Sequence, residues 1–482
     1  MTAAGDFSQG SVHRHILRLA VPMTLAQLCN ILYNIVDRIF IGHIESGSSL
    51  ALTGLGVVFP LLAIIAAFAN LAGQGGAVHF AIARGRGDDA TAGRIMGNAF
   101  ALILGFAFIL MLVSYVAMEP LLRAFGASDL SLPYARDYLQ IYLLGTPASM
   151  IALGMVPFIN AQGAARAAML SVAIGALLNT ALDPLLIFVF GMGVRGAALA
   201  SVLAQLVAAA FVLRCLTGSG LPLGLSVGQL APDLALLRQI VTLGLANFTF
   251  QITNSAVAVV SNTMLLRYGG DVHVALLTIL SSIRQVISMP SGAVNTATQP
   301  VMSYNYGAKK PGRVLAGIRF NLLSGGLYNF VFQLLILAFP AAFLRLFSSD
   351  PELIRLGVMD TRIYFAGFAF MALQFAGQST FLALGMARHA IFFSLLRKAI
   401  LVIPLTLLLP GICGFGVHGV YLAETASQYL GASTCFLTMW LGVGRRLRAE
   451  AAAEVAAAAA GTGAATTAGT AAAGTATESS VD

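Results

Sequence analysis

Residues 191–196 read GMGVRG, and residues 414–419 read GFGVHG. These segments belong to an internal repeat in which corresponding residues lie 222 to 224 positions apart. The matched pairs include Tyr142 and Tyr364, Gly163 and Gly385, Arg166 and Arg388, Gln205 and Gln428, Gln27 and Gln251, and Asn30 and Asn254. Matching polar residues in a fixed order indicate a duplicated chain. Two similar lobes that move about a site held between them are a common plan of membrane transporters.

The composition predicts a membrane protein. Of the 482 residues, 58% are hydrophobic and 10% are charged, whereas about 25% of residues are charged in soluble domains. Apolar stretches of about 20 residues, long enough to cross the hydrocarbon core as a helix, recur along the chain. We therefore predict an all-α polytopic membrane protein with about twelve transmembrane helices, at residues 16–41, 51–80, 95–118, 138–161, 168–190, 197–216, 239–266, 274–304, 320–344, 363–383, 390–410 and 420–443.

Six spans in each half is an even number, so both halves enter the membrane in the same orientation. We expect parallel repeats related by an axis along the membrane normal. The predicted organisation is an N-terminal lobe over residues 1–217, a cytoplasmic linker over 218–238 and a C-terminal lobe over 239–448. Residues 449–482 are rich in Ala, Gly and Thr and offer few large side chains to bury, which predicts a disordered low-complexity tail.

Basic residues gather in the loops that follow spans two, four, eight, ten and twelve. Short loops rich in Lys and Arg are cytoplasmic, so both termini are predicted to lie inside the cell. Topology thus accounts for the net charge of +8, and no aromatic–basic patch predicts a nucleic-acid partner. The four cysteines and seven histidines lack metal-ligand spacing. No nucleophile–base arrangement indicates an enzyme, and we expect no cofactor.

Three acidic residues lie within predicted spans, where a charged side chain costs about 2.5–3.5 kcal/mol on insertion scales. They are Asp37 in span one, Asp183 in span five and Glu424 near the start of span twelve. Asn179 precedes Asp183 by four residues and shares its helix face. Pro184 interrupts the same helix and frees a backbone carbonyl. With Ser201 of span six, these oxygens suit Na⁺, or the carboxylates carry H⁺.

Each of these residues also has a structural interpretation. Asp37 could end its span at the outer interface, and Glu424 could extend towards the membrane surface. The amides of Gln27, Asn30, Asn34 and Asn254 either line a substrate or ion path or join neighbouring helices by hydrogen bonds. Arg284, Arg397 and Lys398 are basic residues of the second lobe. They either pair locally, act as counter-ions to Glu424 or bind an anionic group.

Several sequence motifs of the chain resemble those of a known family. Residues 33–43 (YNIVDRIFIGH) are similar to the first-span signature of multidrug and toxic compound extrusion transporters. Residues 179–184 (NTALDP), 193–198 (GVRGAA) and 299–309 (QPVMSYNYGAK) resemble further motifs of that family in the same order. The resemblance extends over about residues 10–445 and is closest to the bacterial subgroup with acids in the first lobe.

The resemblance implies a V-shaped pair of six-helix lobes in the bacterial cytoplasmic (inner) membrane. It also implies export of cationic lipophilic drugs or dyes in exchange for inward Na⁺ or H⁺. Carried over to this sequence, the ion-coupling site comprises Asp37, Asn179 and Asp183, which would be the Na⁺ ligands if coupling uses sodium. Ser201 stands where the family often has Thr. The first span of the second lobe has no acid, which favours a coupling site in the first lobe, and we expect a monomer.

Two alternatives remain open from the sequence. A lipid or lipid-linked oligosaccharide flippase of the same superfamily would need a basic groove for pyrophosphate, for which only Arg284, Arg397 and Lys398 are available. A channel or membrane receptor belongs to another class of function. The repeat and the acid–amide–proline cluster argue against that class, and uptake kinetics linked to Na⁺ or H⁺ would distinguish them.

Overall fold

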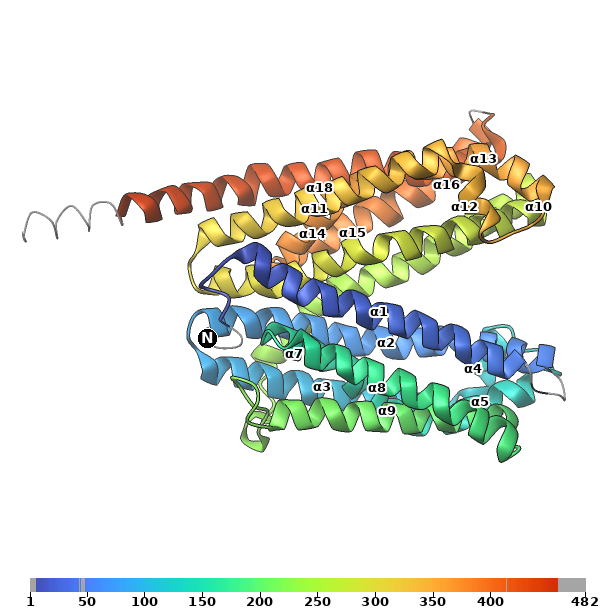
Figure 1. Cartoon of the computed structure of the whole chain (residues 1–482), viewed down its shortest axis with the longest axis horizontal. Helices are drawn as coiled ribbons and strands as arrows, with labels where there is room; N and C mark the ends of the chain where they lie inside the picture. The colour runs from blue at the N-terminus through green and yellow to red at the C-terminus, as the bar shows by residue number, and fades with distance from the viewer. Residues whose placement is uncertain (1–5, 43, 45–47, 413, 458–482) are drawn as a thin grey trace, which may run out of the picture.

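The structure is a computed structural model that describes residues 6–42, 44, 48–412 and 414–457. Within these residues every regular element is a helix (Figure 1). The first half of the chain contains α1 (Val12–Gly42), α2 (Ser48–Gly85), α3 (Asp89–Val116), α4 (Met118–Ala124), α5 (Leu132–Leu144), α6 (Thr146–Gly154), α7 (Val156–Ala161), α8 (Ala165–Pro184), the π-helix η1 (Leu185–Val189) and α9 (Gly193–Thr217).

The second half begins after a short 3-10 helix, η2 (Val227–Gln229). It contains α10 (Leu234–Gly307), α11 (Pro311–Ala338), α12 (Pro340–Arg345), α13 (Pro351–Phe365), η3 (Phe368–Phe370), α14 (Met371–Ala383), α15 (Ala387–Leu395), η4 (Leu396–Val402), α16 (Ile403–Ile412), α17 (Gly416–Ser427), η5 (Gln428–Ala432), α18 (Ser433–Thr438) and η6 (Met439–Val443). Gly270 divides α10 into two helices because its φ of 71° is not helical.

The described helices confirm a polytopic α-helical fold. Nine of them are long and apolar enough to cross a membrane, and the pair formed by α5 and α6–α7, bent by 62°, makes a tenth span. The break in α10 at Gly270 separates spans seven and eight. The run from α17 to η6, which short π-helices interrupt, lies where the sequence predicts the last span. The described helices thus account for the positions of all twelve predicted spans.

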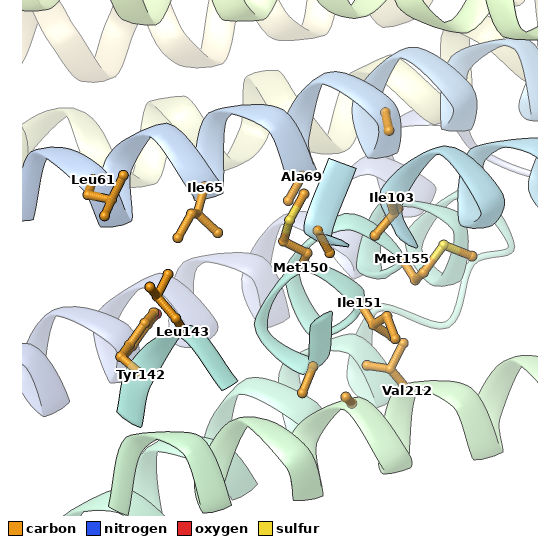
Figure 2. Packing of buried hydrophobic residues seen from close by; sticks show 14 of the residues in the cluster. Leu61, Ile65, Ala69, Ile103, Tyr142, Leu143, Met150, Ile151, Met155 and Val212 are labelled. Carbon is orange, nitrogen blue, oxygen red and sulfur yellow. The ribbon is translucent and has the colours of Figure 1, made fainter. Parts of the chain in front are cut away.

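Each half of the chain packs around its own apolar interior. Figure 1 shows the first half, blue to green, below the second half, yellow to red, and the two groups of helices separate towards the right of the view. Figure 2 shows part of the first interior, where Leu61 and Ile65 of α2 face Leu143, Met150 and other buried residues of α5 and α6. Burying such side chains is worth roughly 1.5–3 kcal/mol each in water. Between helices in lipid, close packing supplies the stabilisation instead.

The two halves meet at one end of the molecule, which we call the basic end because it carries Arg86, Lys309 and Lys310. There α2 of the first half packs against α10 of the second half. Glycines permit this approach, since a Cβ on Gly75 or Gly307 would overlap the backbone of the facing helix. The positive-inside pattern predicts that the basic end is cytoplasmic.

The segment before α1 also joins the halves at the basic end. Arg313 of α11 donates hydrogen bonds to the backbone carbonyls of Phe7 (2.7 Å), Gln9 (3.1 Å) and Gly10 (2.7 Å). The amide of Asn305 donates to the Phe7 carbonyl over 3.0 Å. The residues just before α1 are thereby fixed to α10 and α11 of the second half.

The C-terminal end departs from the prediction in one respect. We expect disorder from Ala449, but the helical region continues to Ala457, so the prediction was wrong for residues 449–457. The many alanines explain the difference, because alanine has the highest intrinsic helix propensity. Residues 458–482 lie outside the described part of the chain.

Candidate functional site

A buried polar cluster in the first half centres on α8. Asp183 is completely buried, and Asn179, one turn earlier, is 2% exposed. The Nδ2 atom of Asn179 donates to Asp183 Oδ1 over 3.3 Å and to Ser201 Oγ of α9 over 3.3 Å. Asn179 therefore joins the two helices through its side chain. The structure brings together three residues that the sequence analysis selected.

Asp37 joins this cluster from α1, which packs along α8. Its side chain is buried, with 8% exposed, so it does not end the span at an exposed interface. Asp37 and Asp183 are near enough to interact electrostatically. Two carboxylates on different helices thus share one site of low polarity, where like charges repel strongly.

Two tyrosines of α5 complete the cluster, and neither was predicted from the sequence as a site residue. Tyr138 is buried beside Asp37 and Ser201. The hydroxyl of Tyr142 accepts a hydrogen bond of 2.9 Å from Gln205 Nε2 of α9. The repeat contained a signal for this pair, because both Tyr142 and Gln205 have matching residues in the second half.

The backbone of α8 is irregular next to these side chains. Pro184 ends the α-helix, and the π-helix η1 follows directly. A proline removes one backbone hydrogen bond of the helix and displaces the preceding turn. π-Helical turns within α-helices are frequent at functional sites. The irregular backbone of α8 therefore lies directly beside the acid and the amide of the cluster.

The cluster offers oxygen atoms that suit a cation. Within the described residues, Asn179 Oδ1, Asp183 Oδ2 and Gln205 Oε1 are buried and accept no hydrogen bond. Carboxylate and amide oxygens are the ligands that hard cations prefer, and a buried carboxylate alternatively takes up a proton. No group of three His, Cys, Asp or Glu residues with metal-binding geometry occurs in the described chain. The residues thus fit Na⁺ or H⁺ better than a transition metal.

The second half contains a different charged cluster, which we call the basic cluster. Glu424 of α17 pairs with Arg284 Nη1 of α10 at 2.9 Å, Lys398 Nζ of η4 at 3.0 Å and Arg397 Nη1 of η4 at 3.5 Å. The side chain of Glu424 is 8% exposed, so the alternative in which it extends to the membrane surface was wrong. The three basic residues act as its counter-ions. Glu424 occupies the repeat position of Ser201.

Comparison with known proteins identifies the family. The family model MatE matches residues 22–185 and 248–408, which make up most of the chain. The chain belongs to the MatE family. The resemblance to multidrug and toxic compound extrusion transporters is confirmed, and these proteins are membrane transporters rather than enzymes.

Bacterial relatives of this MatE protein match it over nearly their whole length. The multidrug export protein MepA of Staphylococcus haemolyticus is 23% identical over 428 residues, covering 88% of this chain and 93% of the relative. MepA of Staphylococcus aureus strain N315 is 24% identical over 437 residues, covering 90% and 95%. These matches are to proteins that their names describe as multidrug exporters.

Solved structures show the same fold. A MATE structure described as being in the bent conformation superimposes with a TM-score of 0.88 at 21% identity, covering 94% of this chain and all of the other. A MATE transporter described as outward-facing gives a TM-score of 0.85, also at 21% identity, covering 93% and 99%. The MatE protein is thus a multi-pass membrane protein of this architecture.

The amides that the sequence offered for a substrate or ion path are less buried than the two clusters, where the structure describes them. Gln27 and Asn30 are exposed on α1, two to three turns before Asp37, and Asn254 is partly buried in α10. The side chain of Asn34 lies outside the described residues. A role of these four amides on the substrate or ion path stays a prediction.

A pocket of about 250 Å³ lies between residues of both halves of this MatE protein, and we call it the inter-lobe pocket. The first half contributes α2, and the second half contributes α10, α14 and η4. Its polar lining consists mainly of side-chain amides: Asn70, Gln74, Asn247, Gln251, Asn295, Gln299, Gln374 and Gln378. Arg397 is the one charged residue among the described lining residues. The sequence alone did not predict this amide lining.

Proposed function

We propose that this protein is a secondary active multidrug efflux antiporter. It exports cationic lipophilic compounds in exchange for inward Na⁺ or H⁺. The observation that carries the proposal is the buried cluster of Asp37, Asn179, Asp183 and Ser201, whose acceptor oxygens include two without a hydrogen-bond donor in the described chain. Membership of the family and the named function of the bacterial relatives support it.

The cluster supplies a physical basis for coupling. Two nearby carboxylates attract a cation, because each is buried and their negative charges repel. Binding Na⁺ or H⁺ removes that repulsion and changes the preferred packing of α1 against α8. If the drug-binding conformation is the one that binds the ion less tightly, each ligand lowers the affinity for the other by the same factor. The lobes then alternate between two arrangements around the inter-lobe pocket.

We further propose that the protein acts as a monomer in the bacterial cytoplasmic membrane with both termini in the cytoplasm. The loop charges support this orientation. The flippase alternative receives less support, because Arg397 is the only one of the three basic candidates that lines the inter-lobe pocket. A pyrophosphate group would need several cationic side chains in one groove.

The test is dye efflux from proteoliposomes under a Na⁺ gradient at constant pH and, separately, under a pH gradient without Na⁺. We expect one of the inward gradients to accelerate efflux of rhodamine 6G relative to protein-free liposomes. Efflux that responds to neither gradient contradicts antiport. Movement of a lipid-linked pyrophosphate from one leaflet to the other under the same conditions would instead support the flippase.

A further inference from the structure

The inter-lobe pocket has an unusual charge for a protein proposed to export cations. Its described lining contains eight side-chain amides and one guanidinium group but no carboxylate. Amides donate and accept hydrogen bonds without a net charge. A compound that carries only a positive charge therefore meets no opposite charge in this lining, whereas an anionic group meets Arg397.

Arg397 is buried and incompletely paired. Its side chain is 6% exposed, and its Nε atom has no hydrogen-bond acceptor within the described residues. Its Nη1 atom lies 3.5 Å from Glu424, farther than the corresponding atoms of Arg284 and Lys398. Arg397 is thus the most weakly held of the three counter-ions, and it is the one that lines the pocket.

The charges of the basic cluster do not balance. Arg284, Arg397 and Lys398 share the single carboxylate of Glu424. Arginine remains protonated in proteins, so even a neutral Lys398 leaves two guanidinium groups against one carboxylate. An excess of buried positive charge is unfavourable unless an anion compensates it. Because Arg397 lines the inter-lobe pocket, a negatively charged group of a bound ligand could supply that anion.

We propose that the inter-lobe pocket binds compounds that carry a carboxylate, and that Arg397 recognises this group. A guanidinium group offers two parallel N–H donors that match a carboxylate. Gln374 of α14 also lines the pocket, and its Oε1 atom accepts no hydrogen bond within the described residues, so it suits a donor group of such a ligand. This inference rests on the proposed function and deepens it, because the exported compounds would include zwitterions with a carboxylate beside their cationic group.

Two dyes that differ in one group provide the test. Rhodamine 110 carries a free carboxylate, and rhodamine 123 is its methyl ester, with the same cationic ring system. Binding of each dye to the purified protein in detergent is measured by fluorescence polarisation. We expect Arg397→Gln to weaken rhodamine 110 binding roughly tenfold, since a hydrogen bond to a charged group contributes on that order. Rhodamine 123 binding should change less than about twofold.

Arg397→Lys is the matched control, because it keeps the charge but loses the second parallel donor. It should weaken rhodamine 110 binding less than Arg397→Gln does. A misfolded variant would lose both dyes together, so rhodamine 123 reports on folding. Equal effects of Arg397→Gln on the two dyes in a folded protein, or a wild type that binds rhodamine 123 but not rhodamine 110, would overturn the inference. Neither result depends on a transport gradient, so the antiport proposal is tested separately.

Discussion

Gly307 of α10 packs directly against the backbone carbonyl of Ile82 of α2, and a Cβ atom at Gly307 would overlap that oxygen. The contact joins the two halves at the basic end, where Arg313 also holds the segment before α1. A glycine at such a contact lets two helices approach closely in a membrane. The lobes of a transporter must separate at such a contact when it changes from one arrangement to the other.

The first prediction is that Gly307→Val opens the basic end. The added side chain cannot fit beside Ile82, so the arrangement with this end closed becomes less stable. In a chain without its four native cysteines, Gln74→Cys in the inter-lobe pocket should react faster with a water-soluble maleimide when Gly307 is replaced. Gly312→Val is the control, because a Cβ there meets no atom within 4 Å. Equal labelling rates in the two variants would contradict the assignment of this contact.

The second prediction concerns the hydrogen bonds from Arg313 to the backbone of Phe7 and Gly10. Arg313→Ala removes these bonds and should free the segment before α1. A hydrogen bond to a charged group contributes about 1.5–3 kcal/mol to stability. Limited proteolysis should then cleave before α1 sooner than in the wild type. Arg319→Ala, an exposed residue on the same helix, should leave the cleavage rate unchanged. Equal cleavage in both variants would mean that the segment is held by other contacts.

The third prediction is that Asp183→Asn abolishes ion-coupled export while the protein still inserts and folds. The substitution keeps the size of the side chain but removes the charge that a coupling ion must neutralise. Gradient-driven dye efflux from proteoliposomes should fall to the level of protein-free liposomes. Asp137→Asn, at an exposed ion pair with Arg195, should retain efflux. If Asp183→Asn exported the dye at the wild-type gradient-driven rate, Asp183 would not be part of the ion-coupling site.

The fourth prediction uses the two hydrogen bonds of Asn179. Asn179→Leu removes both and leaves Asp183 Oδ1 without its donor, which should cost about 1–3 kcal/mol of unfolding free energy. Ser201→Ala removes only one acceptor and should cost less, and Ser201→Thr keeps the hydroxyl and should be nearly neutral. Thermal unfolding in detergent measures this order. A Ser201→Ala variant less stable than Asn179→Leu would show that Asn179 does not join the helices.

The fifth prediction separates stability from coupling in the basic cluster. Glu424→Gln leaves three basic side chains without their carboxylate, and removing one partner of a buried ion pair costs about 3–5 kcal/mol. We expect its unfolding temperature to fall further than that of Asp183→Asn. Its folded fraction should retain more gradient-driven efflux, because the first lobe carries the coupling acids.

A second substitution checks this explanation. Lys398→Met in the Glu424→Gln background removes one unpaired cation and should recover part of the lost stability. A coupling energy near zero between the two substitutions would contradict the shared ion pair. Loss of efflux in Glu424→Gln equal to that in Asp183→Asn would extend the coupling site into the second lobe.

The sequence by itself determined the membrane location, the duplication and the candidate acids of the first lobe. Long apolar stretches and a fixed repeat spacing are visible in the sequence itself. In a membrane, the long apolar stretches form spanning helices, because each helix satisfies its own backbone hydrogen bonds. Asn179 and Asp183 could be placed on one helix face because four residues make about one turn. Ser201 could be proposed because it lies in span six and stands where the family that the chain resembles often has Thr.

Only the tertiary structure decided which side chains from different helices meet. Tyr138 lies beside Ser201, and Lys398 pairs with Glu424, through the packing of different helices. The interpretation of Glu424 as an end-of-span acid failed for the same reason, since its three counter-ions come from two other elements. Hydropathy reports how apolar a helix is, but the rotation of each helix against its neighbours depends on side-chain packing. That rotation turned eight scattered amides and Arg397 towards one pocket.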